Sequence, residues 1–299
     1  MSHVLVAGAG YTGRRIATLL VDAGHSVTVA SRTPPSIPGT TPLVLNVDEA
    51  ASRDSLSDRL RESVDDLVYL IPPDRTAPQA SDTDARLISV LDAVSPGLRR
   101  VVLASTTGVY GDHAGGDVTE TTATAPITER AKARVGAERS LARFAAQHHV
   151  RYTILRIAGI YGPDRLMLDG IEAGRPILQE ADAGPGNRIH VDDLAQAFLC
   201  ALESDLPDEV INVADGDAMS PTAFARKVAE LAALDPPPEV DRVTAQKTFS
   251  PMRLSFMNES RRIRPRRLLK LLGDRMRYAD PVEGIRASLQ AMGLLAADD

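Results

Sequence analysis

The chain has 299 residues, of which 43% are hydrophobic and 25% are charged, and its formal net charge is -6. These proportions are ordinary for a globular protein and argue against disorder, collagen and coiled coil. The acidic balance offers no electrostatic footprint for nucleic acid. No run of about 18 apolar residues is present, and the first strand begins too early for a cleaved signal. We therefore expect a cytoplasmic protein with no nucleic-acid or membrane partner.

Short apolar segments alternate with helical patterns along the chain. Seven segments predict strands, at 3–7, 26–30, 42–47, 66–71, 100–105, 152–156 and 210–213. Helical patterns cover 14–20, 53–63, 82–94, 131–147 and 192–202. An Asp of the pair Asp192-Asp193 is the expected N-cap of the last of these helices. This alternation predicts an α/β, doubly wound Rossmann fold with a mostly parallel seven-stranded sheet.

We expect a single compact unit with two parts. The Rossmann core would comprise about residues 1–163 and 187–214, and a small C-terminal substrate lobe would comprise about 164–186 and 215–299. Ligands of such sheets bind outside the carboxyl ends of the strands, so the strand ends should line one crevice. The oligomeric state is left open.

A glycine-rich turn, G-A-G-Y-T-G at 8–13, lies between the first strand and the first helix. Glycines at this spacing let the backbone turn tightly and approach a pyrophosphate, and the following helix N-terminus supplies free N–H groups. A chance glycine turn is the alternative. The predicted cofactor-binding residues are Gly8, Gly10, Tyr11, Thr12 and Gly13, with Leu70, Ile71, Pro72 and Ser105 at later strand ends.

The second strand ends in Ser31-Arg32, where NAD-binding proteins commonly carry an acid. A carboxylate there would hydrogen-bond the ribose 2'-hydroxyl of NAD, whereas a guanidinium can bind the 2'-phosphate of NADP through two charge-assisted hydrogen bonds. The Ser31 hydroxyl would add a donor. A solvated surface arginine is the alternative. We therefore predict NADP(H) as the cofactor, with NAD(H) less favoured.

Three further segments carry a family resemblance: L-A-S-T-T-G-V-Y-G-D at 103–112, R-I-A-G-I-Y-G-P at 156–163 and N-R-I-H-V-D-D-L-A at 187–195. With the glycine turn, they resemble the extended or atypical branch of the short-chain dehydrogenase/reductase superfamily, which includes nucleotide-sugar epimerases and dehydratases. The segment at 187–195 and Y-A-D-P-V-E-G at 278–284 most resemble the YeeZ-like group of this branch. The resemblance spans nearly the whole chain and implies a dinucleotide cofactor and a small-molecule substrate.

One family feature is absent. The family places a catalytic tyrosine four residues before a lysine, shortly after the Val-Tyr-Gly segment, and here those positions fall on Arg130 and Arg134. An arginine stays protonated at working pH, so it can stabilise charge but cannot cycle as an acid and base. A shifted alignment would pair Thr128 with Lys132, which keeps a hydroxyl without the acidity of a phenol.

The resemblance also assigns candidate site residues. Thr106 falls on the position of the family hydroxyl that binds substrate, although a strand-end threonine can instead cap a turn. Tyr110 is a candidate replacement acid, and its counterparts in the family are usually structural or line the substrate. Thr107, Tyr161 and Arg188 are candidate substrate contacts, with a surface ion pair as the alternative for Arg188.

We interpret the chain as an NADP(H)-binding oxidoreductase or epimerase-like enzyme acting on a small or nucleotide-linked substrate. A non-catalytic NADP(H)-binding sensor is the alternative. The arginine cluster at 261–267 is read first as a solvated helix start, second as an anionic-substrate contact and third as a nucleic-acid patch. Cys200 is expected in the core, and no residue spacing suggests a metal site.

Overall fold

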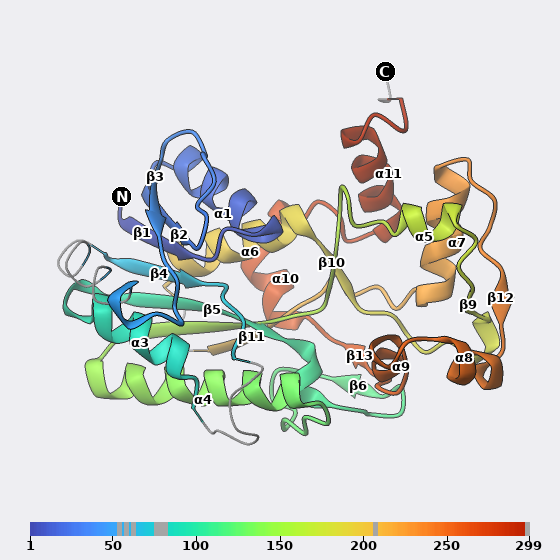
Figure 1. Cartoon of the computed structure of the whole chain (residues 1–299), viewed down its shortest axis with the longest axis horizontal. Helices are drawn as coiled ribbons and strands as arrows, with labels where there is room; N and C mark the ends of the chain where they lie inside the picture. The colour runs from blue at the N-terminus through green and yellow to red at the C-terminus, as the bar shows by residue number, and fades with distance from the viewer. Residues whose placement is uncertain (53–55, 57–59, 61–63, 75–82, 206–208, 297–299) are drawn as a thin grey trace.

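The computed structural model shown in Figure 1 describes the chain except residues 53–55, 57–59, 61–63, 75–82, 206–208 and 297–299. Its centre is a seven-stranded sheet in the order β3-β2-β1-β4-β5-β7-β11, with every neighbouring pair parallel. The strands are β1 (His3–Ala7), β2 (Ser26–Ser31), β3 (Thr40–Val44), β4 (Asp66–Tyr69), β5 (Arg100–Thr106), β7 (Arg151–Ile157) and β11 (Glu209–Val213). The predicted doubly wound α/β fold is confirmed.

The third strand lies earlier than predicted. The apolar run at 42–47 suggested its bounds, but β3 spans Thr40–Val44, because Thr40 pairs with Val27 and the ladder ends where Val44 pairs with Ser31. The Leu45 N–H still donates to the Ser31 carbonyl at 2.9 Å, but the apolar run continues beyond the last residue in register with β2. A strand is defined by its partner, which a run of apolar residues does not reveal.

Helices cover both faces of the sheet (Figure 1). One face packs against α1 (Tyr11–Asp22), α6 (Val191–Glu203) and α10 (Arg266–Leu272), which bury Ile16, Phe198 and Leu268 against it. The other face packs against α3 (Ala85–Val94) and α4 (Glu129–His148). Cys200 is buried on α6, as expected. The helix predicted at 53–63 falls largely outside the described residues.

The N-cap predicted for α6 is wrong. His190 holds that position, and its Nδ1 accepts a hydrogen bond from the Asp192 N–H at 3.2 Å. Asp192 lies in the first turn instead. Asp193 is fully buried, and its two carboxylate oxygens accept the backbone N–H groups of Arg277 and Tyr278, each at 2.9 Å. The sequence pattern could not show whether these aspartates cap their own helix or bind the backbone N–H groups of a distant loop.

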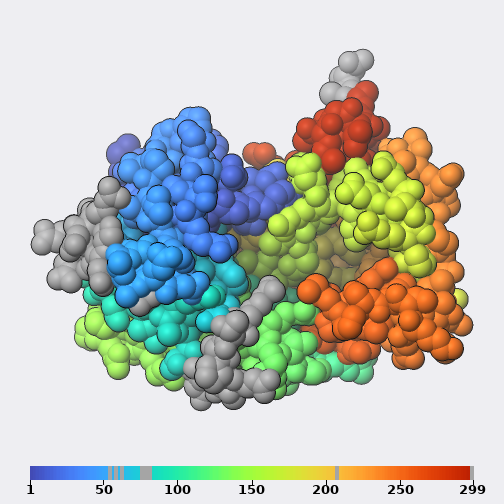
Figure 2. Space-filling view, in the orientation of Figure 1, coloured from blue at the N-terminus to red at the C-terminus, as the bar shows by residue number. Residues whose placement is uncertain are grey.

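The segments beyond the carboxyl ends of β7 and β11 form a smaller group of elements on the right of Figure 1. Parallel pairs β8 (Gly159–Tyr161) with β10 (Arg188–His190), β9 (Ile177–Leu178) with β12 (Glu239–Val240), and β6 (Asp117–Val118) with β13 (Arg262–Ile263) lie there. The helices of this group are α5 (Leu168–Glu172), α7 (Pro221–Leu231), α8 (Arg242–Thr248), α9 (Pro251–Met257) and α11 (Pro281–Ala291). Figure 2 shows these later segments facing the N-terminal ones across the middle of the molecule.

Side chains of the arginine cluster at 261–267 form contacts between these elements and the core. Arg266 begins α10, but Arg261 is 9% exposed and donates to the Gly111 carbonyl at 2.6 Å. Arg264 pairs with Asp117 at 2.9 Å, and Arg267 pairs with Glu209 at 3.2 Å. The expectation of a simple solvated helix start is therefore wrong, because three of these side chains form structural contacts.

Within the described parts of the chain, no helix is both long enough and apolar enough to cross a membrane.

Candidate functional site

The glycine-rich turn has the geometry of a dinucleotide cradle. Gly8 adopts a φ of 114°, which favours glycine, and its N–H donates to the Ala30 carbonyl at 2.8 Å. A Cβ placed on Gly13 would lie 2.0 Å from the Gly8 carbonyl oxygen, whereas one on Gly10 would meet nothing within 4 Å. Gly13 therefore permits the close packing of helix and strand, and Gly10 leaves open space where a pyrophosphate can approach.

The start of α1 is free to bind an anion. Gly10 is the N-cap, and no side chain caps the helix. The first N–H groups of a helix lack partners within it and carry a partial positive charge. Leu70 closes one side of the turn, because its Cβ would lie 3.1 Å from a Cβ on Gly8. The half-buried Ile71 and the exposed Pro72 continue from there. Leu70, Ile71 and Pro72 thus lie beside the turn, where sequence reasoning expected cofactor contacts.

The end of β2 carries the two residues expected to select the cofactor. The Ser31 hydroxyl oxygen is buried and has no hydrogen-bond partner. Arg32 is exposed immediately after the strand. An unpaired buried hydroxyl next to an exposed guanidinium fits a ligand that brings its own oxygens. The cradle, the free helix start and these two residues together fit a dinucleotide.

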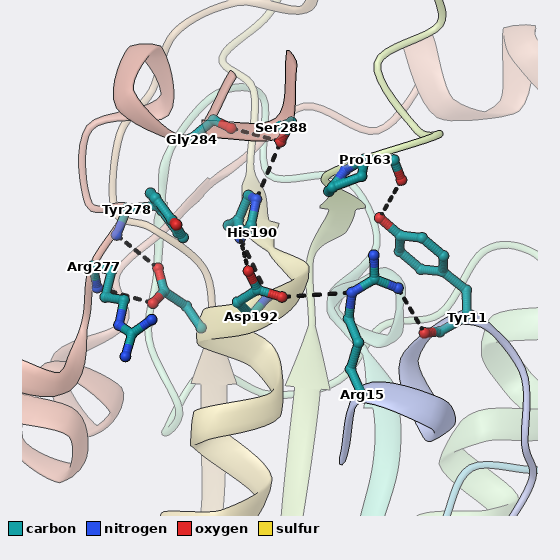
Figure 3. Close-up of polar contacts among 10 residues, drawn as sticks. Tyr11, Arg15, Pro163, His190, Asp192, Arg277, Tyr278, Gly284 and Ser288 are labelled. Atoms are coloured by element: carbon teal, nitrogen blue, oxygen red, sulfur yellow. Dashed lines mark hydrogen bonds and ion pairs between the residues drawn. The ribbon is translucent and has the colours of Figure 1, made fainter. Parts of the chain in front are cut away.

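The Tyr11 side chain points toward Pro163 (Figure 3). Its hydroxyl donates to the Pro163 carbonyl at 2.7 Å. The guanidinium carbons of Arg15 and Arg165 lie 4.2 and 4.0 Å from the ring centroid. Burial raises the pKa of the phenol. The Tyr11 side chain thus contacts the loop after β8.

A buried histidine joins the core to the C-terminal helix (Figure 3). His190 Nε2 lies 3.1 Å from the Ser288 hydroxyl of α11, which itself donates to the Gly284 carbonyl. Since Nδ1 accepts from the α6 backbone, Nε2 is the protonated nitrogen of a neutral ring. Burial lowers the pKa of His190 to about 4. Asp192, two residues after His190, lies 3.5 Å from Arg15 on α1.

The end of β5 presents a single partly accessible hydroxyl. Thr106 is half-buried, and its Oγ1 accepts the Gly108 N–H at 3.2 Å. Ser105 is buried, and its hydroxyl donates to Glu138 at 2.5 Å. Thr107 is also buried. The side chains of Ser105 and Thr107 are thus buried, and of these three hydroxyl residues Thr106 is the most exposed.

A buried ion pair supports this strand end. Arg156 on β7 forms a bidentate contact with Glu138 on α4, at 3.1 and 2.7 Å, and both side chains are less than 10% exposed. Tyr110 stacks on Arg156 at 4.8 Å and donates its hydroxyl to Asn212 at 2.7 Å. Sequence reasoning missed the Glu138–Arg156 pair, although charged residues within apolar helix and strand patterns are the available signal.

The geometry of Tyr110 is that of a structural residue. Its ring is fully buried, and burial raises the pKa of the phenol. A proton donor must come within hydrogen-bond reach of the substrate, and this hydroxyl is directed at Asn212 instead. The structure therefore speaks against Tyr110 as the replacement acid.

The start of α4 carries the two arginines that sequence reasoning expected at the positions of the family's tyrosine and lysine. Arg134 Nη1 donates to the Ala104 carbonyl of β5 at 2.8 Å. Burial raises the pKa of Asp84, and the nearby charge of Arg134 opposes that rise. Arg130, one turn earlier, is exposed. In the shifted alternative, Thr128 is the helix N-cap and Lys132 pairs with Glu129 on the exposed surface, so neither faces the strand end.

Two predicted substrate contacts lie below the surface. Arg188 is 7% exposed and donates to the Met219 carbonyl at 2.7 Å, so the alternative of a surface ion pair is wrong. Tyr161 is 3% exposed and lies edge-on to His190 and Phe224. The Tyr161 hydroxyl, Arg188 Nη1 and one oxygen of Asp215 are buried without partners. Burial raises the pKa of Asp215 to about 7.

Another part of the surface is hollowed but lacks these features. A groove of about 340 Å³ between α1 and α6 is lined mainly by the outward sides of the two helices. It contains Arg14, Asp22, Gln196 and Arg277 but none of the strand ends. We therefore locate the functional site at the carboxyl edge of the sheet.

The chain belongs to the NAD dependent epimerase/dehydratase family, whose model matches residues 4–214. Protein YeeZ of Escherichia coli K12 is 26% identical over 249 residues, covering 79% of this chain and 86% of YeeZ. A functionally unknown conserved protein from Silicibacter pomeroyi DSS is 32% identical with a TM-score of 0.79, covering 98% of this chain and 99% of that chain. MoeE5 in complex with UDP-glucuronic acid and NAD is 23% identical with a TM-score of 0.77, covering 98% and 99% of the two chains, and shares the fold. The expected family resemblance is confirmed.

Proposed function

We propose that the chain is a cytoplasmic, NADP(H)-dependent oxidoreductase or epimerase-like enzyme that acts on a small or nucleotide-linked substrate. The observation that carries this proposal is the glycine cradle, with its uncapped helix start and its open space at Gly10. The Ser31 hydroxyl and Arg32 favour the 2'-phosphate of NADP over the free hydroxyl of NAD.

The proposed site is formed by two parts of the chain, one for the cofactor and one for the substrate. The Rossmann core, about residues 1–163 and 187–214, would hold the cofactor, and the lobe of about 164–186 and 215–299 would enclose the substrate. A bound nicotinamide supplies hydride exchange with a carbinol or carbonyl carbon. Thr106 would hydrogen-bond the substrate oxygen. Arg134 would supply fixed positive charge at the end of β5 without exchanging a proton.

The cofactor assignment is tested by titration of the protein with NADPH and NADH. We expect NADPH to bind about ten- to a hundred-fold more tightly, the range for loss of a charge-assisted contact. Arg32→Asp should reverse the preference, because a carboxylate repels the 2'-phosphate. Arg143→Asp, on the exposed side of α4, is the matched control and should leave it unchanged. Equal affinities for the two cofactors in all three proteins would refute the NADP assignment.

The arginines at positions 130 and 134 favour one alternative, a sensor that binds NADP(H) without turnover. The two functions differ in a direct measurement. An enzyme oxidises NADPH in the presence of carbonyl or nucleotide-sugar substrates and loses rate when Thr106 is changed. A sensor binds the same cofactor and shows no turnover with any member of those panels.

A further inference from the structure

The start of α4 faces a cationic and partly apolar segment of the lobe. Residues 242–258, which form α8 and α9, contain Arg242, Lys247 and Arg253 and no acidic residue. Figure 1 shows α9 beside the N-terminal end of α4, and Figure 2 shows this orange segment against the green start of that helix.

Arg130 is the residue that joins the two sides. Its Nη2 donates to the Ser255 hydroxyl of α9 at 3.2 Å, and its guanidinium carbon lies 4.2 Å from the Phe256 ring centroid. In the part of the chain that the structure describes, no carboxylate lies within 4.0 Å of it. Arg130 is therefore oriented by a hydroxyl and an aromatic ring, while none of the described carboxylates pairs with its charge. A guanidinium held in this way can bind an oxyanion through two parallel hydrogen bonds.

Exposed apolar side chains accompany this charge. Phe256 and Met252 are 61% and 62% exposed and stand four residues apart on α9, so they share one side of that helix. Arg130 contacts Phe256, which turns this side of α9 toward the start of α4. Ile127, three residues before Arg130, is 57% exposed. A ligand bound here would therefore meet apolar surface next to a fixed positive charge.

The reacting end of the proposed site is one helical turn away. Arg134 follows Arg130 by four residues, about 6 Å along the helix, and contacts Ala104, two residues before Thr106. We propose that Arg130 anchors an oxyanion of the substrate, a carboxylate or phosphate attached close to the reacting carbon, with the apolar part of the substrate against Phe256 and Met252. This inference rests on the proposed function and narrows its substrate class to organic anions. At the position of the family's tyrosine, the chain thus has a binding residue in place of a proton donor.

The test uses protein saturated with NADP⁺ and measures binding of two matched pairs by calorimetry. Mandelate and mandelamide differ in a carboxylate beside a carbinol carbon, and phenyl phosphate and phenol differ in a phosphate. We expect at least one anion to bind about ten-fold or more tightly than its neutral partner. Arg130→Met should abolish that preference, and Arg130→Lys should keep part of it. Arg143→Met, on the same helix, should behave as the unaltered protein does.

The outcomes separate this inference from the proposed function. Failure of the unaltered protein to bind NADP⁺ would count against the proposed function. A saturated protein that prefers neither anion, or that keeps its preference after Arg130→Met, would overturn the role of Arg130 alone. Arg130 is exposed, so its replacement should leave folding and NADP⁺ affinity unchanged, and both are measured in every variant. The pair that shows the preference identifies the oxyanion as carboxylate or phosphate.

Discussion

Two regions at the same edge of the sheet differ in the kind of group they present. The glycine turn presents backbone, with three glycines, an uncapped helix start and no room for a Cβ on Gly13 beside the Gly8 carbonyl. The ends of β5 and α4 present side chains, supported by Glu138, which accepts from Ser105 and pairs with Arg156. Among the residues of this second region, Arg130 and Arg134 stay protonated and cannot exchange a proton.

The difference has a physical cause. The glycine turn works through its backbone, so a side chain at Gly13 would collide with main-chain atoms whatever its chemistry. Arg130 is exposed on a helix that buries its opposite side, so that position can change its chemistry without disturbing the core. Binding geometry is thus sterically constrained, while catalytic chemistry at the helix start is free to vary.

The largest effect that would test this contrast is expected at Gly13. Gly13→Ala places a methyl group 2.0 Å from the Gly8 carbonyl oxygen, and overpacking of this kind costs about 1–3 kcal/mol or more. We expect a lower melting temperature together with loss of cofactor binding. Gly10→Ala is the matched control, because its Cβ meets nothing within 4 Å. It should fold normally and lose cofactor affinity alone. Normal stability and affinity in Gly13→Ala would contradict the steric explanation.

A smaller effect is expected at the end of β5, where two hydroxyls can be compared. Thr106→Val removes the partly accessible hydroxyl and should lower turnover about a hundred-fold, while loss of its bond to the Gly108 N–H should cost about 1 kcal/mol of stability. Tyr110→Phe removes the bond to Asn212 and should destabilise the fold by about 1–3 kcal/mol, with the turnover of the folded protein retained. Steady-state rates and urea denaturation measure both. The opposite pattern would return Tyr110 to the reacting centre.

The sequence predicted the fold class better than it predicted the contacts of individual side chains. The strands and the glycine turn follow from local patterns, because alternating elements and glycine spacing are each readable within about 30 residues. The burial of Arg188 and Arg261 was not readable, because their partners Met219 and Gly111 lie 31 and 150 residues away. The sequence also could not show that Tyr110 is buried and donates to the distant Asn212, which makes it a structural residue instead of a candidate acid.

The smallest net effect is on the pH dependence of the free energy of unfolding. It arises from His190 and Asp215, which lie where the Rossmann core meets the lobe. Burial raises the pKa of Asp215 from 3.8 to about 7, so the folded state retains a proton that the unfolded state has lost. Its contribution to stability therefore falls as pH rises from about 4 to 7. Burial lowers the pKa of His190 from 6.5 to about 4, so the unfolded state holds the extra proton. Its contribution rises with pH over about 4 to 6.5.

These two contributions oppose each other, so the unaltered protein should show little dependence on pH from these groups. In Asp215→Asn, His190 is the one of these two groups that still titrates. The free energy of unfolding should then rise from pH 4.5 to 6.5. His190→Asn can keep an acceptor for the α6 backbone, and Asp215 is then the one of the two groups that titrates. The free energy of unfolding should therefore fall over the same interval. Urea denaturation at pH 4.5, 5.5, 6.5 and 7.5 distinguishes the two slopes. Identical slopes in both variants would show that neither group is held in the protonation state its burial favours.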